Sequence, residues 1–223
     1  MESTKHGGTR RARLSAVVGA GELVTLDTTQ AALGVDRRTA AKTLARWTGQ
    51  GKEVVYVLLT SGEAGIDGMD PAEAGPARET EQRESAAIVG VTRVDFLGLP
   101  DGVLEYGVPL RRDIAAAIRR HRPELVVTGN FRDTWPGDVG TNMADHTATG
   151  RAVVDAVRDA ANRWLFRDAG EPWSGVRWVA AAASPRNSHA VDVGEHFARG
   201  VASLAAHRAY LDALSGDMAD PEG

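Results

Sequence analysis

The chain has 223 residues, of which 43% are hydrophobic and 25% are charged, as is ordinary for a folded domain in water. Its net charge of -4 does not indicate a polyanion-binding protein, and the absence of cysteine excludes disulfides and thiolate metal sites. Any bound metal would need His, Asp or Glu ligands. No apolar run is long enough to cross a membrane and no signal-peptide core is present, so a cytoplasmic protein is expected.

The N-terminal fifty residues are predicted to form a tail followed by a helical segment. Basic residues gather within residues 1–13, which are expected to be a flexible tail. Residues 14–50 contain two helical stretches, one ending at Gly34 and one capped by Asp36. Helix, glycine-containing turn and helix together are the layout of a helix-turn-helix. Two helices of an ordinary domain are the simpler interpretation of the same pattern.

From residue 51 onward, apolar runs alternate with amphipathic helices. The run "EVVYVLL" reads as a buried parallel strand, and "ELVVTGN" and "RWVAAAA" as later strands. Residues 71–89 are expected to start as a Pro/Gly-rich loop and to become a charged amphipathic helix. Further helices are expected at residues 110–121 and 147–164, with a final helix at 197–214. This alternation predicts a Rossmann-like three-layer α/β/α fold with a mostly parallel sheet in residues 51–223.

Polar loops follow the predicted strands. They read "TSGEAG", "LPDG" and "GNFRDTWPGDVGTNMADH". Ligands of open parallel sheets bind beyond the carboxyl ends of the strands, so these loops are expected to share one crevice.

The stretches around these loops resemble the PIG-L/LmbE family of zinc-dependent de-N-acetylases, over about residues 45–223. The matching segments are "GKEVVYVLLTSGEAG", "ARETEQRESAAIVGV", "DFLGLPDGVLEYG", "TGNFRDTW", "MADHTATGRA" and "HAVDV". The resemblance implies a hydrolase that removes an N-acetyl group from an amino sugar or a similar small amide. In such an enzyme zinc polarises the acetamide and activates water, a carboxylate is the base, and a histidine assists the leaving amine.

The resemblance also assigns residues to the site. His146 corresponds to a zinc ligand, and Asp145 and His189 correspond to catalytic positions. His121, at the end of a predicted helix, is instead expected at the surface. Four further residues are expected to line the substrate pocket: Arg78, Asp101, Asn130 and Trp135.

One family motif is missing. In the family, an H-P-D-D motif after the first strand supplies two zinc ligands and the general base, and no such motif occurs here. Counting back from "ARWTGQGKEV" places it near residues 32–35. Taking "LSAVV" as the first strand places it instead at "GAGE", where Glu22 or Asp27 would be the only replacement. We therefore expect impaired or absent hydrolysis.

Residues 14–50 resemble another family, the winged-helix segment of AbiE-type antitoxin regulators. In a true helix-turn-helix, basic side chains of the second helix would contact DNA, which gives a DNA-binding regulator as the alternative function. The competing interpretation is that this helix packs on the sheet through Ala41, Leu44 and Ala45. The oligomeric state is left open. The residues that would contact DNA are Arg37, Arg38, Lys42 and Arg46.

Overall fold

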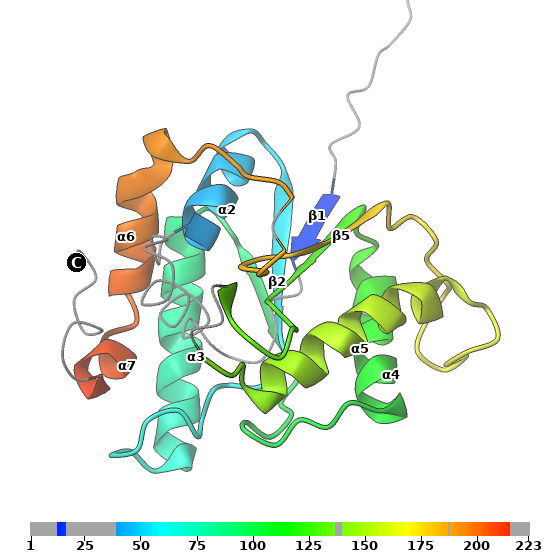
Figure 1. The fold of residues 1–223 in the computed structure, drawn as a ribbon, viewed down its shortest axis with the longest axis horizontal. Coiled ribbons are helices and arrows are strands. Elements are labelled where there is room, and N and C mark those ends of the chain that lie inside the picture. The colour runs from blue at the N-terminus through cyan, green and yellow to red at the C-terminus, as the bar shows by residue number, and fades with distance from the viewer. Residues whose placement is uncertain (1–12, 17–38, 137–139, 187, 215–223) are drawn as a thin grey trace, which may run out of the picture.

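A computed structural model describes residues 13–16, 39–136, 140–186 and 188–214 (Figure 1). Within these ranges no helix is long and apolar enough to span a membrane. The strands are β1 (Arg13–Ala16), β2 (Glu53–Leu58), β3 (Arg93–Phe96), β4 (Leu125–Thr128) and β5 (Trp178–Ala181). The helices are α2 (Thr39–Gly49), α3 (Pro71–Ile88), α4 (Val108–His121), α5 (Ala144–Ala161), the short η2 (Gly194–His196), α6 (Phe197–Ala205) and α7 (Arg208–Ala213).

The strands form one five-stranded sheet in the order β3-β2-β1-β4-β5. Every pairing between neighbouring strands is parallel. The central strand is β1, in which Leu14 pairs with Val54 of β2 on one side and with Leu125 of β4 on the other. This topology confirms the predicted Rossmann-like α/β fold, with β2 and β4 as near neighbours.

Helices cover both faces of the sheet because side chains of β2 alternate between two apolar clusters. Val55 and Val57 pack in the cluster that includes α4 and α5 residues such as Ile114 and Val153. Val54, Tyr56 and Leu58 pack in the cluster formed with α2 and α3. Figure 1 shows the two helix layers on opposite sides of the strands, with α6 beside α2 and α3.

The segment predicted as a helix-turn-helix contributes to this sheet core. Its backbone supplies all of β1 but Arg13, so the first strand overlaps the start of "LSAVV", as in the second of the two alignments. Within α2, Ala41, Leu44 and Ala45 are buried against β2 and α3, as the packing interpretation requires. The stretch between them, residues 17–38, lies outside the described residues.

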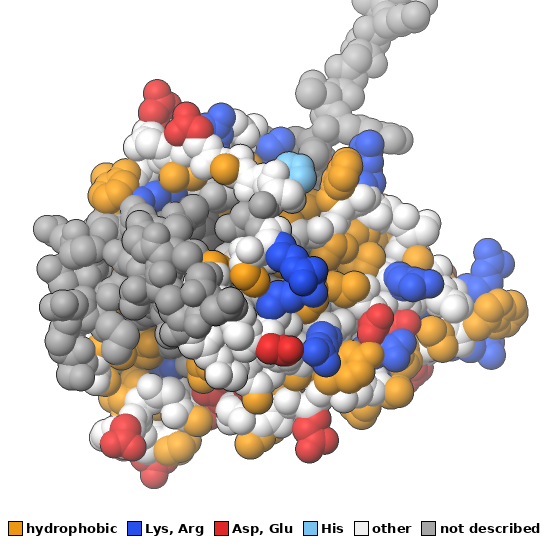
Figure 2. All heavy atoms as spheres, viewed as in Figure 1, with side chains coloured by type: hydrophobic (Ala, Val, Ile, Leu, Met, Phe, Trp, Pro, Cys, Tyr) orange, Lys and Arg blue, Asp and Glu red, His pale blue; other side chains and the backbone are white. Residues whose placement is uncertain are grey.

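The two edges of the sheet differ in chemistry. β3 carries the charged residues Arg93 and Asp95, which protect an exposed edge from pairing with other strands. The β5 strand instead exposes Trp178 and Val179, with 69% and 41% of their surfaces accessible. Figure 2 shows hydrophobic side chains gathered on the face that includes β5. The predicted late strand therefore exists, but it is an exposed edge and not a buried strand.

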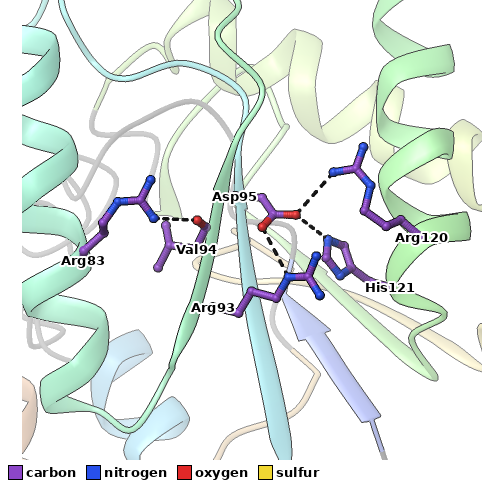
Figure 3. A network of polar contacts seen from close by, with 6 residues as sticks. All are labelled: Arg83, Arg93, Val94, Asp95, Arg120 and His121. Atoms are coloured by element: carbon purple, nitrogen blue, oxygen red, sulfur yellow. Dashed lines mark hydrogen bonds and ion pairs between the residues drawn. The ribbon is translucent and has the colours of Figure 1, made fainter.

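The expectation that His121 lies at the surface was wrong. Its side chain is buried, and its Nε2 lies 2.8 Å from Asp95 Oδ2, which Arg120 also approaches, whereas Arg93 meets the other oxygen, Oδ1 (Figure 3). Burial lowers the pKa of His121 despite the opposing hydrogen bond with Asp95. Burial by itself would raise the pKa of Asp95, but its bonds with His121 and Arg93 bring that pKa below the ordinary value. The last residue of α4 is therefore hydrogen-bonded to β3. The helical periodicity of the sequence could not indicate this contact.

The predicted final helix is divided at His207, which separates α6 from α7. His207 is 3% exposed and, among the described residues, its Nε2 has no hydrogen-bond partner. Burial, reinforced by the positive charge of Arg78, lowers the pKa of His207 to about 3. The folded protein therefore holds this ring in its neutral form.

We predict that His207 makes the fold sensitive to acid. Because its pKa is lower in the folded than in the unfolded chain, its contribution is complete above the ordinary pKa of about 6.5 and is lost as pH falls toward 3. Between pH 7 and pH 5 this loss should be about 2 kcal/mol of unfolding free energy. Urea unfolding at pH 7 and pH 5 measures this loss, and the difference in unfolding free energy between the two pH values should be smaller in His207→Gln than in the unsubstituted chain. His189→Gln, at an exposed position, should leave the difference unchanged; an unchanged difference in His207→Gln would contradict the prediction.

Candidate active site

The candidate site lies where the strand order reverses. From β1 the chain proceeds to β2 and β3 on one side, and β4 and β5 lie on the other side of β1. In such sheets the ligand crevice forms outside the carboxyl ends of the strands at this switch point. The polar loops after β2, β3 and β4 therefore lie at this edge of the sheet, where the sequence predicted that they share one crevice.

The loops after β2 and β3 are joined by two carboxylates. Asp101 accepts hydrogen bonds from Thr60 Oγ1 at 3.0 Å and from the Ala64 backbone N–H at 3.1 Å. In return, the Asp101 backbone N–H donates to Glu63 Oε1 at 2.8 Å. Asp101, predicted to line the pocket, therefore holds two loops together. Glu63 was missed because a single acidic residue in a loop gives no sequence signal.

Asp145 joins the loop after β3 to the start of α5. It is 5% exposed, and its two carboxylate oxygens accept the backbone N–H groups of Gly102 at 2.8 Å and Leu104 at 3.0 Å. The helix begins at Ala144, three residues earlier than predicted, so His146 lies in its first turn and not in a preceding loop. Asp145 thus holds a loop beside His146, whereas its catalytic assignment stays a prediction.

The loop after β4 folds back on the same helix. Its turn is closed by Asn130, whose Nδ2 donates to the Thr134 carbonyl at 3.0 Å and whose Oδ1 accepts the Arg132 N–H at 3.0 Å. The indole of Trp135 is 2% exposed and meets the His146 ring edge-to-face, with 6.0 Å between the ring centroids. The structure therefore brings Trp135 next to His146 and links Asn130 to the same histidine through Asn142.

His146 is 5% exposed and lies 3.1 Å, through Nδ1, from the Oδ1 of Asn142. Asn142 is also buried and contacts the backbone of the loop after β4 through Nδ2. Sequence reasoning missed this residue. The only available signal was its position one helical turn before the histidine.

Arg78 and His189 are placed differently from the residues above. Arg78 is buried, donates to the Gly62 carbonyl at 2.8 Å, and lies over the Tyr210 ring. A Cβ at Gly62, where φ is +66°, would lie 2.7 Å from the guanidinium carbon, so glycine is required on both grounds. His189 is exposed and its Nδ1 bonds with Ser188. No contact between described residues links His189 to His146.

The described residues do not complete a metal site. They contain no group of three or more His, Asp or Glu side chains that could hold a metal ion. His146 fits the requirement for one ligand, but both oxygens of Asp145 already accept backbone hydrogen bonds. A catalytic zinc needs three protein ligands, so the donor set of the described residues is too small. Glu22 and Asp27, the replacements considered from the sequence, lie outside the described residues.

The basic residues of the DNA-binding alternative also have defined positions where the structure describes them. Lys42 is buried with its Nζ 3.6 Å from the centre of the Phe197 ring, and Arg46 Nη1 donates to the Asp192 carbonyl at 2.6 Å. Lys42 therefore contacts the first residue of α6, and Arg46 contacts the segment before that helix. Arg37 and Arg38 lie outside the described residues. These contacts give no support to a DNA-binding surface on α2.

Comparison with known proteins places this site in a family. A diacetylchitobiose deacetylase of Thermococcus kodakarensis is 34% identical over 117 residues, which cover 52% of this chain and 42% of the relative. The chain therefore spans less than half the length of that curated relative.

Two solved structures share the fold. The N,N'-diacetylchitobiose deacetylase of Pyrococcus horikoshii aligns with a TM-score of 0.72 at 20% identity, over 92% of this chain and 72% of the other. A conserved protein of Thermus thermophilus aligns with a TM-score of 0.64 at 26% identity, over 91% and 80%. The family model for GlcNAc-PI de-N-acetylases, PIG-L, matches residues 36–157, more than half of the chain and all of α2 through most of α5. The chain therefore belongs to the PIG-L family.

Proposed function

We propose that the protein is an N-deacetylase of the PIG-L type, with a crevice for an N-acetylated amino sugar or a similar small amide and with impaired hydrolysis. The observation that carries this proposal is the set of three loops at the switch point, two links between which are made by Asp101 and Asp145 while Asn142 closes the loop after β4. Such a connected set of hydrogen bonds holds a site in place before a ligand arrives, which is what catalysis by positioning needs. Family membership supports the reaction class.

The residues in this frame have definite tasks. Asp145 fixes the loop that follows β3, and Trp135 packs against the ring of His146. His146 is the described residue that would help to hold zinc. When bound in this family, zinc would polarise the acetamide carbonyl and activate water. The chain lacks the H-P-D-D motif, which would provide the other ligands and the base after β1. Binding of the amide and its hydrolysis are therefore expected to be separable here.

Zinc content tests the impairment. We expect the purified chain, dialysed against metal-free buffer after loading with zinc, to retain less than stoichiometric zinc, because one histidine alone does not form a tight site. Elemental analysis of the protein and of His146→Ala gives the measurement. His207→Gln, which changes a buried histidine outside the loop frame, is the matched control. Stoichiometric zinc that disappears only in His146→Ala would show that other residues complete the site, and would contradict impairment.

Acetate release tests the reaction class in the same samples. N-acetylglucosamine and N,N'-diacetylchitobiose are the probes, and ligand-observed NMR reports binding independently of turnover. Binding without acetate release would support the proposal as stated. Failure to bind either sugar, in a folded sample, would contradict the proposed substrate class.

A further inference from the structure

The side chain of Asn142 has a defined orientation, because its two ends meet different kinds of partner. Its Nδ2 lies 2.8 Å from the Asn130 carbonyl oxygen and 2.9 Å from the Arg132 carbonyl oxygen. Both partners can only accept, so the atom that faces them must be the amide nitrogen. Its Oδ1 accepts the backbone N–H of Met143 at 2.9 Å, which agrees with the same orientation. A flipped amide would place an oxygen against two carbonyl oxygens.

This orientation determines the proton position on His146. The ring atom Nδ1 lies 3.1 Å from Asn142 Oδ1, and an amide oxygen can only accept. Nδ1 must therefore carry the hydrogen. In the neutral ring only one nitrogen is protonated, so Nε2 then carries the lone pair.

The surroundings hold both side chains in this arrangement. Asn142 and His146 are 7% and 5% exposed, so water has little access to either. The backbone N–H of Asn142 donates to the Asp133 carbonyl at 2.8 Å, which attaches the residue to the loop after β4. Trp135 meets the imidazole at 82°, and this contact restricts rotation of the ring. Burial, the backbone hydrogen bond and the ring contact therefore all favour this one arrangement of the pair.

We propose that Asn142 is a positioning residue that fixes His146 as the Nδ1–H tautomer and so places the lone pair of the neutral ring on Nε2. Neutral imidazole binds divalent metal ions through such a lone pair, and a hydrogen bond at one ring nitrogen sets the other nitrogen as the one that carries it. The use of the lone pair rests on the proposed function. The tautomer does not, because it follows from the hydrogen bonds alone.

Asn142 has two roles that use different atoms, and variants can separate them. Nδ2 anchors the loop after β4, whereas Oδ1 sets the tautomer. Asn142→Leu has a similar size and removes both. Asn130→Ala removes the hydrogen bonds of that side chain with Thr134 and Arg132 and so loosens the same loop, but it leaves Oδ1 of Asn142 in place.

Long-range proton–nitrogen NMR correlation of the full chain labelled with nitrogen-15 histidine measures the tautomer directly. Spectra are recorded near pH 8.5, about two units above the ordinary histidine pKa, so that neutral rings dominate. The His146 signals are assigned by their loss in His146→Gln. We expect His146 to show the Nδ1–H pattern in the unsubstituted chain and in Asn130→Ala. In Asn142→Leu we expect this pattern to be replaced by the Nε2–H pattern or by a mixture of the two.

Several results would overturn the proposal. An Nε2–H ring of His146 in the unsubstituted chain would overturn the proposal by itself, even if Asn142→Leu fails to fold. An unchanged Nδ1–H ring in folded Asn142→Leu would show that Oδ1 does not set the tautomer. Loss of the Nδ1–H pattern in Asn130→Ala would show that the conformation of the loop after β4, and not Oδ1 of Asn142, sets the tautomer. Since the spectrum does not depend on turnover, an Nδ1–H ring in a protein that binds no N-acetylated sugar would contradict the proposed function alone.

Discussion

Replacing residues 17–35 with a family-type segment that begins Ala-His-Pro-Asp-Asp should create N-deacetylase activity on N-acetylated amino sugars. The unaltered chain should release no acetate above background. We expect a difference in rate of roughly 10⁴-fold or more, because the change supplies both a metal-activated water and a general base. Acetate release from N-acetylglucosamine, with zinc content measured on the same samples, tests this.

The structure explains why so local a replacement should suffice. β1 is already in place at the centre of the sheet, between β2 and β4. Asp101 and Asp145 join the loops at the carboxyl edge of the sheet, Asn142 closes the loop after β4, and His146 lies in the first turn of α5. A His and an Asp of the new segment together with His146 would make three ligands, and the remaining Asp would be the base.

Two matched variants make the repair experiment decisive. The same segment with the first Asp changed to Asn keeps the metal ligands but removes the base, and should lose about 10²–10⁴-fold of the gained rate. His146→Ala in the repaired chain should lose both zinc and activity. Equal activity in repaired and unaltered chains would show that the motif is not needed. A repaired chain that binds zinc but has no activity would show that the rest of the pocket does not support the reaction.

Arg119→Met should lower the unfolding free energy by about 3–4 kcal/mol, because it removes one side chain that satisfies many buried carbonyls. Arg119 is 5% exposed and donates to backbone oxygens at the end of α5 and in the loop that follows it. That loop includes Phe166 with φ of +48°, an unfavourable conformation for a residue with a side chain, so it depends on such contacts. The acceptors are the carbonyls of Asp159, Ala160, Asn162, Leu165, Phe166 and Gly170.

The neighbouring residue provides the control. Arg120 leaves 54% of its side chain exposed and forms an ion pair with Asp95 at 3.4 Å. Arg120→Met should therefore cost less than about 1 kcal/mol, as is usual for exposed pairs. Equilibrium unfolding in urea measures both variants. A similar small loss in the two would contradict the proposed role of Arg119 in holding the loop.

The regular elements could be predicted where one periodic signal dominated. The apolar β-branched run from residue 53 became β2, and Leu110, Ile114 and Ile118 became the buried face of α4. The order of these elements was enough to predict a parallel α/β sheet. Helix ends were less accurate: α5 begins at Ala144, where Met143 at the N-cap position makes no side-chain cap bond that a sequence pattern could reveal.

The candidate site could be located but not interpreted from the sequence. Family order brought His146, Asp145 and Asp101 to one region, and the switch point of the sheet agrees with that region. Their tasks depended on partners from other loops. Asp101 accepts from Thr60, 41 positions away, and Asp145 accepts from Leu104, also 41 positions away. No local pattern carries information about such partners.

By itself, the sequence determined the class of fold, the family resemblance, the absence of thiolate ligands and the absence of H-P-D-D, because these are properties of composition, periodicity and order. Only the tertiary structure decided that α2 packs in the sheet core, that His121 and His207 are buried, and that Nδ1 of His146 faces Oδ1 of Asn142. Burial and hydrogen-bond direction arise when segments distant in the chain meet, and removal from water then sets which protonation state is stable.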